Sequence, residues 1–117
     1  MIVKLLGPNI DQLLKLCGGT FSIKTTMMIG LQVLDRIEVL HNHGYIHGDI
    51  SPENCMMGLN SESPLVFLAD FGRCKKYRNK VTGQHIGYKE GINYSFNHIY
   101  ASINAHNNVQ ASRRDDL

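Results

Sequence analysis

The sequence predicts an α+β fold that is mainly helical and carries one small β-hairpin. Apolar residues recurring three and four positions apart indicate one long helix between Ser22 and Gly44. Two short apolar runs on either side of a polar turn at 59–64 indicate a hairpin. Residues 73–100 show no sustained period, which indicates a long loop. With 117 residues, the chain is long enough for one domain or for part of one.

Two short elements are expected before the long helix. Residues 2–6 form an apolar run that Gly7-Pro8 stops, which predicts the end of a strand followed by a turn. Residues 9–17 predict a short helix with Asn9 as its N-cap. Gly18-Gly19 ends this helix.

The long helix has a start signal, an apolar stripe and a stop signal. Ser22 is the expected N-cap, and Gly44 supplies a residue that adopts a left-handed conformation at low cost. The predicted apolar stripe consists of Met27, Leu31, Leu34, Ile37 and Leu40. A polar loop follows at 45–54, and the strands of the hairpin are expected in CMMG and LVFLA. The final residues, SRRDDL, predict the opening of a further helix.

Composition excludes several classes of protein. The net charge is +2 and no arginine-rich stripe with interleaved aromatic residues is present, so we expect no nucleic-acid partner. No stretch approaches the roughly 18 apolar residues of a membrane helix, so we expect a soluble protein with no membrane partner. The three cysteines are widely spaced and form no CxxC pair, which favours reduced thiols and a cytoplasmic or nuclear location.

Two motifs carry the chemistry. Residues 45–54 read YIHGDISPEN, and Asp70-Phe71-Gly72 follows the second apolar run. They match the pattern H-x-D-x-x-x-x-N and the D-F-G of protein kinases. A lone D-F-G would be weak evidence, but both motifs occur here with a long helix before them, a hairpin between them and a long loop after them. We therefore interpret them as a catalytic loop and a magnesium-binding loop.

The spacing suits phosphoryl transfer, which depends on positioning and on neutralising phosphate charge. Asp49 is placed to accept and orient a substrate hydroxyl. Asn54 offers a carbonyl oxygen and Asp70 a carboxylate, and both are hard oxygen ligands of the kind that Mg²⁺ prefers. Gly72 is expected to let the backbone turn sharply after Asp70. Each residue alone is more often a turn former than a catalytic group, so the interpretation depends on the combination.

The chain resembles the casein kinase I family of serine/threonine protein kinases over its whole length. The resembling segments are LLGPNIDQLL, YIHGDISPEN, MMGLN, ADFGRCKKYR, QHIGY, YASINAH and SRRDDL. The triplet Ser102-Ile103-Asn104 is the most specific, because this family has it where most kinases have A-P-E. The resemblance implies a protein-kinase-like fold, with residues 1–117 forming part of the C-terminal lobe from the hinge to the helix after the activation segment.

The resemblance also implies a role for each site residue. Lys4 to Leu6 would be the hinge that binds adenine through backbone hydrogen bonds, and Met56 would form the floor of the adenine pocket. Ala69 would lie just behind the phosphates. The catalytic base would be Asp49, with Asn54 and Asp70 as ligands of Mg²⁺ in a complex with ATP. Asp116 would begin the helix that anchors the catalytic loop, and Lys75 would attract acidic or previously phosphorylated protein substrates.

Several positions depart from the family pattern. Gly48 stands where an arginine usually precedes the catalytic aspartate, although the related vaccinia-related kinases share this change. Ser51 replaces the lysine that would contact the transferred phosphate, and this change should lower the rate. In the activation segment the departures are Ile92, Phe96, Asn97 and Ile99. Much of the family's anion-recognition site is therefore lost.

Two functional hypotheses follow. No glycine-rich loop, N-lobe lysine or helix C glutamate precedes Met1, so we expect a kinase fragment that is inactive in isolation and that exposes apolar surface. The first hypothesis is an ATP- and Mg²⁺-dependent kinase of casein kinase I type. The alternative is a pseudokinase or protein-binding scaffold, which the changes at Ser51, Ile92 and Ile99 motivate. A non-kinase nucleotide binder is disfavoured because neither GxxxxGK[ST] nor GxGxxG is present. Metal binding by the histidines is also disfavoured, since no cysteine or carboxylate completes a ligand set.

Overall fold

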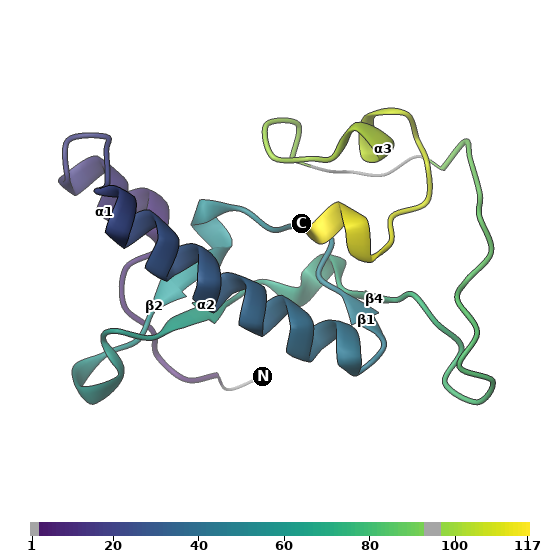
Figure 1. Ribbon diagram of the computed structural model, residues 1–117, viewed down its shortest axis with the longest axis horizontal. Helices are drawn as coiled ribbons and strands as arrows, with labels where there is room; N and C mark the ends of the chain where they lie inside the picture. Colours follow the sequence, from purple (N-terminus) through teal and green to yellow (C-terminus); the bar gives the residue numbers. More distant parts are fainter. Residues whose placement is uncertain (1–2, 93–96) are drawn as a thin grey trace. The chain divides into compact units, whose positions relative to one another are not determined.

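A computed structural model describes residues 3–92 and 97–117 of the chain (Figure 1). The chain forms two compact units, each of which is described separately. The first contains Met1–Arg36 and Ser51–Ala69, and the second contains Ile37–Ile50 and Asp70–Leu117. The α-helices are α1 (Ile10–Leu16), α2 (Ile23–Asn42) and α3 (Ile103–His106). The strands are β1 (Tyr45–Ile46), β2 (Cys55–Met57), β3 (Val66–Leu68) and β4 (Lys75–Lys76).

Helix α1 has Asn9 as its N-cap, as predicted, and Asn9 forms a capping box with Gln12. The Asn9 side chain accepts the N–H of Gln12 at 2.8 Å, and the Gln12 side chain accepts the N–H of Asn9 at 3.0 Å. These two bonds satisfy donors that a helix start leaves without an intrahelical partner. Gly18 and Gly19 follow the helix with φ of 75° and 85°, which confirms the predicted stop.

Removing the N-cap of α1 should lower the stability of the first unit. We expect Asn9→Ala to lower the free energy of unfolding by about 1 kcal/mol, because the N–H of Gln12 loses its acceptor. Urea denaturation followed by circular dichroism measures this change. Gln12→Ala, which removes only the reciprocal bond, is the matched variant and should cost less. Equal stability of Asn9→Ala and the parent chain would contradict the assignment of the cap.

The predicted hairpin is confirmed and supplies most of the first unit's core. Strands β2 and β3 pair antiparallel, with Met56 opposite Phe67, and the 3₁₀-helix η2 (Asn60–Glu62) lies in the turn. Ile10, Cys55 and Val66 are buried together, and Leu13, Phe21, Ile29, Val33, Met57 and Leu68 pack against them. Burial raises the pKa of the Cys55 thiol to about 11, so this thiol stays protonated at neutral pH. All three cysteines are free thiols.

Side chains of α2 bind the outer edge of the hairpin. Gln32 donates to the carbonyl of Pro64 at 3.1 Å and accepts the N–H of Val66 at 2.9 Å. Arg36 Nε donates to the carbonyl of Val66 at 3.2 Å. These bonds satisfy backbone groups that an edge strand would otherwise present to solvent. Polar residues of α2 therefore hold the hairpin together with its apolar residues.

The prediction of a buried apolar stripe on α2 is wrong for the first three residues of the stripe. Met27, Leu31 and Leu34 are exposed, at 63%, 62% and 50%. The helix packs through Ile29 and Val33 in the first unit, while Ile37 is buried in the second. The two stripes have similar apolar character, so periodicity alone could not decide which one faces the core. The expected exposure of apolar surface is confirmed on this helix.

The prediction of a strand at 2–6 is wrong for the residues of this segment that the structure describes. Residues 3–6 have no strand partner among the described parts of the chain, and a strand is defined by its neighbour. Pairing begins instead at the predicted turn, where Gly7 N–H donates to Met57 O at 2.8 Å. Met57 N–H donates to Pro8 O at 3.0 Å, and an isolated bridge joins Asn9 to Met56. Ile2 lies outside the described residues.

The second unit contains a strand pair that was not predicted. Strands β1 and β4 pair antiparallel, with Ile46 opposite Lys75. Tyr77 is buried beside them, and its hydroxyl donates to the carbonyl of His41 at 2.7 Å. Arg113 lies 4.9 Å from the centre of the Tyr77 ring. Two residues per strand are too few for a period-2 pattern, so this pair is not recognisable in the sequence.

The predicted long loop is largely confirmed. Residues 77–92 and 97–100 contain no helix, and their only bridge among the described residues joins Arg78 to His85. Gly44 follows α2 with φ of 87°, which confirms the predicted stop.

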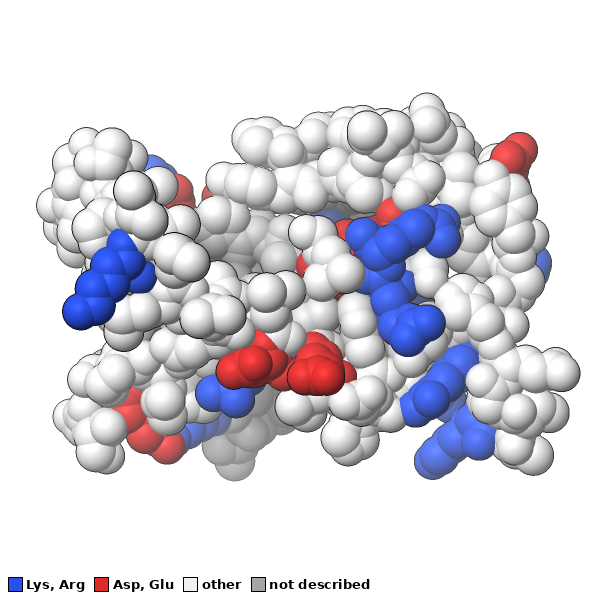
Figure 2. All heavy atoms as spheres, in the orientation of Figure 1, with Lys and Arg blue, Asp and Glu red and all other residues white. Residues whose placement is uncertain are grey.

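No helix in the described part of the chain is long and apolar enough to cross a membrane. On the face drawn in Figure 2, basic side chains lie among acidic and uncharged ones, as expected for a net charge of +2.

Candidate functional site

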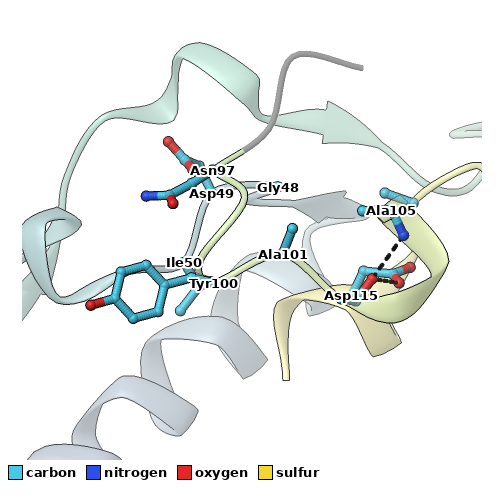
Figure 3. A pocket seen from close by; sticks show the side chains of 10 residues that line it. Gly48, Asp49, Ile50, Asn97, Tyr100, Ala101, Ala105 and Asp115 are labelled. Atoms are coloured by element: carbon cyan, nitrogen blue, oxygen red, sulfur yellow. Dashed lines mark hydrogen bonds between the residues drawn. The ribbon is translucent and has the colours of Figure 1, made fainter. Parts of the chain in front are cut away.

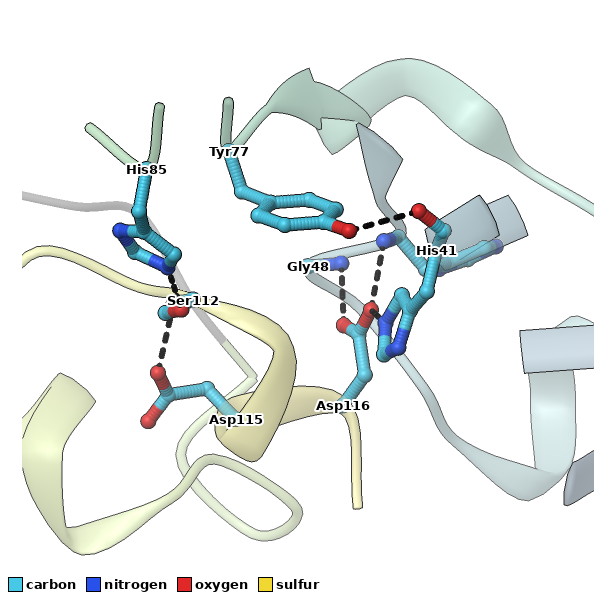
Figure 4. Close-up of polar contacts among 8 residues, drawn as sticks. His41, Gly48, Tyr77, His85, Ser112, Asp115 and Asp116 are labelled. Atoms are coloured by element: carbon cyan, nitrogen blue, oxygen red, sulfur yellow. Dashed lines mark hydrogen bonds and ion pairs between the residues drawn. The ribbon is translucent and has the colours of Figure 1, made fainter. Parts of the chain in front are cut away.

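The loop around His47 is held in place by the buried carboxylate of Asp116 (Figure 4). The N–H of His47 donates to Asp116 Oδ2 and the N–H of Gly48 to Oδ1, both at 2.8 Å. His41 Nε2 lies 2.8 Å from the same Oδ2 atom. Asp116 belongs to the 3₁₀-helix η4 (Arg113–Asp116), which begins at a capping box formed by Ser112 and Asp115. One carboxylate therefore fixes two consecutive peptide groups immediately before Asp49.

Gly48 occupies a conformation that other residues adopt at a cost. Its φ is 77°, and a Cβ atom built there would lie 3.1 Å from the carbonyl oxygen of Arg73. We expect Gly48→Ala to lower the free energy of unfolding by about 1–2 kcal/mol, because a left-handed conformation is unfavourable for alanine. Gly87→Ala is the control, since Gly87 has open space around it. Thermal or urea unfolding measures both variants, and equal effects would contradict a strained Gly48.

Asp49 forms an ion pair with an arginine that follows the second motif. Arg73 Nη1 donates to Asp49 Oδ1 at 3.1 Å. The Asp49 side chain is 15% exposed and the Arg73 side chain 37% exposed. The pair therefore lies at the surface of the second unit, with Asp49 as its more enclosed partner. Such a carboxylate can accept a proton from a hydroxyl group that approaches from solvent.

Asp70 is an exposed carboxylate at a sharp turn of the backbone. Asp70 itself takes the left-handed conformation, with φ of 58°, whereas Gly72 does not, so the expected role of Gly72 needs correction. Asp70 caps the 3₁₀-helix η3 (Phe71–Arg73) by accepting the N–H of Gly72 at 3.1 Å. A Cβ at Gly72 would lie 3.0 Å from Asp70 Oδ1, so glycine leaves room for this bond. Phe71 packs on the His47 ring, with ring centres 5.0 Å apart.

A small pocket of about 40 Å³ lies beside Asp49 in the second unit (Figure 3). Its walls come from Gly48, Asp49 and Ile50 and from residues between Asn97 and Asp115. The Ser102 hydroxyl donates to Asp115 Oδ1 at 2.5 Å and accepts the N–H of Ala105 at 3.2 Å, which starts helix α3. This hydrogen-bond network makes one wall rigid. The pocket has room for one small side-chain group next to the Asp49 carboxylate.

The first unit carries four further residues that the sequence analysis singled out. Asn54 is half-buried at the end of the 3₁₀-helix η1 (Pro52–Asn54), and its carbonyl accepts the N–H of Ala69 at 2.9 Å. Ser51 occupies the N-cap position of this helix without a capping hydrogen bond from its side chain, and it is buried, at 4% exposure. Met56 is half-buried on β2. The strand and η1 thus place Asn54, Met56 and Ala69 on adjoining segments of one unit.

The segment 4–6 presents unused backbone groups. Lys4 Nζ pairs with Glu62 and lies 5.6 Å from the centre of the Phe67 ring. Leu6 is half-buried. Among the residues that the structure describes, the backbone groups of Lys4 and Leu6 have no backbone partner. They are therefore available to a ligand with hydrogen-bonding groups at its edge.

The activation-segment positions are spread over the second unit. Lys75 lies on β4 and is half-buried. Ile92 donates its N–H to Asn108 O at 3.1 Å, while Ile99 is 82% exposed. Asn97 lines the small pocket, and Phe96 lies outside the described residues. Within residues 3–92 and 97–117, no group of three or more His, Cys, Asp or Glu side chains is arranged to bind a metal ion.

Two features of the site were missed by the sequence analysis. The first is Arg73 as the partner of Asp49, which its position directly after Asp70-Phe71-Gly72 could have suggested. The second is the polar network in which His85 Nε2 lies 2.8 Å from Ser112 Oγ, and Ser112 N–H donates to Asp115 Oδ2 at 2.7 Å. No local signal reveals this network, because it joins residues that are 27 positions apart.

The chain matches a known protein family. The family model described as the protein kinase domain matches residues 5–96, which is more than half of the chain. The match includes both motifs, the hairpin between them and the first part of the loop that follows.

Proposed function

The chain belongs to the protein kinase domain family, and on this basis we propose that the kinase domain of which it forms part transfers the γ-phosphate of ATP to Ser or Thr hydroxyls of proteins, as casein kinase I does, and that residues 1–117 alone are inactive. The observation that carries this proposal is the Asp49 carboxylate, which follows a backbone segment fixed by Asp116. A rigid loop lowers the entropy lost when a base is aligned with its substrate. We also propose that residues 1–117 are part of the kinase domain.

Within the second unit, two carboxylates have separate roles in the proposal. Asp49 accepts the proton of the substrate hydroxyl, for which the adjoining pocket leaves space. Asp70 is a metal ligand, since its carboxylate is exposed and only one of its oxygens is used by Gly72.

Within the first unit, the chemistry of Asn54, Met56 and the segment 4–6 suits ATP and Mg²⁺. When bound, the metal ion neutralises phosphate charge and orients the transferred group. The Asn54 amide offers a neutral oxygen ligand, and Met56 offers an apolar surface to a flat ring. The unused backbone groups of Lys4 and Leu6 match the hydrogen-bonding edge of adenine. Ala69 lacks a bulky side chain and is assigned a place just behind the phosphates.

We propose acidic or previously phosphorylated proteins as substrates, with Lys75 as one cation that attracts them. The resemblance to casein kinase I supports this preference. The apolar residues Ile92 and Ile99 reduce the available positive charge, and Ser51 cannot contact a phosphate as a lysine would. A cytoplasmic or nuclear location is proposed because the three cysteines are widely spaced and form no CxxC pair.

Radioactive phosphate transfer tests the proposed function. For this and the later rate measurements, the parent chain is the kinase domain of which we propose that residues 1–117 form part. It is incubated with Mg²⁺ and γ-labelled ATP, together with an acidic protein in dephosphorylated and phosphorylated forms, while residues 1–117 alone are assayed in parallel and should be inactive. We expect label on Ser and Thr, more of it on the phosphorylated form, and none after EDTA removes the metal. Absence of transfer, together with no thermal stabilisation by ATP and Mg²⁺, would favour the alternative of a protein-binding scaffold.

A further inference from the structure

A second charged side chain belongs to the reacting centre. Phosphoryl transfer needs positive charge near the transferred group, usually from an arginine or lysine as well as from metal ions. Among the described residues, Arg73 is the cation that forms an ion pair with Asp49. Ser51, two positions after Asp49, is uncharged and buried. We propose that Arg73 is a catalytic residue that supplies the positive charge to the transferred phosphoryl group, an inference that rests on the proposed kinase function.

The geometry leaves part of the Arg73 side chain free for this task. A guanidinium group has five N–H donors in a planar fork. The contact with Asp49 uses Nη1, and among the described residues Nε and Nη2 have no protein acceptor. The side chain is 37% exposed, so these donors are accessible from solvent. One edge of the fork can therefore hold Asp49 while another binds a phosphate oxygen.

The backbone fixes the position from which Arg73 acts. Arg73 is the last residue of η3, which Asp70 caps, and β4 begins two residues later. Its carbonyl oxygen lies against Gly48, where a Cβ atom would approach to 3.1 Å. The loop that carries Asp49 and the turn that carries Arg73 are therefore packed closely. A side chain placed in this way needs little reorganisation when the substrate binds.

In the proposed step, the substrate oxygen forms a bond to the γ-phosphorus while the bond from that phosphorus to the bridging oxygen of ADP breaks. The bond electrons leave with ADP, and the hydroxyl proton passes to Asp49. Arg73 gains and loses no proton. It donates hydrogen bonds to a non-bridging oxygen of the group in transit, and it keeps Asp49 oriented toward the hydroxyl.

Three variants test the role of Arg73 in transfer. They are Arg73→Leu, Arg73→Lys, and Lys80→Leu as an exposed control from the same segment. We expect Arg73→Leu to lower kcat about 100-fold or more with little change in KM, because the interaction strengthens in the transition state. Arg73→Lys should retain part of the rate, and Lys80→Leu should match the parent chain. An unchanged or higher rate for Arg73→Leu would overturn the inference, and a higher rate would show that the ion pair restrains Asp49.

A binding measurement separates this inference from the proposed function. The Nε–H resonance of Arg73, identified by its loss in Arg73→Lys, is followed by NMR while inorganic phosphate is added. We expect a saturable shift of this resonance, and Lys80→Leu should leave that shift unchanged. Circular dichroism checks that each variant is folded. A shift without transfer by the parent chain would support the Arg73 anion site while rejecting kinase activity. The absence of any shift would overturn the inference whether or not the chain transfers phosphate.

Discussion

Asp49→Asn is expected to lower the rate of phosphate transfer by about 10²–10⁴, the usual contribution of a positioned general base. Asparagine keeps the size of the side chain but cannot take up the hydroxyl proton. It also removes the charge that pairs with Arg73 at 3.1 Å. The measurement is the initial rate of label transfer from ATP to an acidic protein at saturating Mg²⁺.

Asp35→Asn is the matched control for this prediction. Asp35 is exposed on α2 in the first unit, and its substitution makes the same chemical change as Asp49→Asn. Its rate should equal that of the parent chain, and both variants should keep the parent's circular dichroism spectrum. If Asp49→Asn retained the parent's rate, Asp49 would not be the base and the proposed mechanism would be wrong.

Asp116→Ala is expected to cause the largest loss of stability among single substitutions in the second unit. The side chain is buried and accepts the N–H groups of His47 and Gly48, with His41 Nε2 at the same distance of 2.8 Å. Alanine would leave these buried polar groups without an acceptor. The cost should be about 3–5 kcal/mol, a large share of the stability of a small domain.

Urea denaturation measures the effect of Asp116→Ala, with Asp35→Ala as an exposed control that should change stability by less than about 0.5 kcal/mol. Asp116→Asn should also destabilise the chain, because an amide accepts through only one of the two positions that the carboxylate uses. Any transfer activity should fall in both Asp116 variants, since the segment before Asp49 loses its support. A loss in stability below about 1 kcal/mol would contradict the central role of this carboxylate.

The elements that the sequence predicted correctly are those whose signals are local. Asn9 caps α1 through a bond that spans three residues, and Gly44 ends α2 because its own φ is positive. The hairpin of β2 and β3 was predictable from two apolar runs and the polar turn between them. The kinase family was predictable because both motifs are contiguous, and the family match includes them.

Tertiary structure decided the features that depend on distant residues. The periodicity of the apolar residues is compatible with burial of either of two faces of α2. Packing in the first unit buries the face with Ile29 and Val33 and leaves Leu31 exposed. The left-handed conformation of Asp70 in place of Gly72 is, by contrast, a local feature that was not predicted, since the Asp70 carboxylate accepts the N–H of a residue only two positions away.

The features of the candidate site also divide into those predictable from the sequence and those that depend on the tertiary structure. The sequence alone predicts Asp49, Asn54 and Asp70 as the residues for the chemistry, because their side-chain types and spacing are properties of the chain. Only the folded chain showed that Arg73 pairs with Asp49 and that Asp116 holds the peptide groups before it. These contacts join residues 24 to 69 positions apart. Such contacts form only when the free energy gained by packing offsets the entropy lost in closing the chain between the two residues. A local sequence pattern does not reveal which of these two terms is larger.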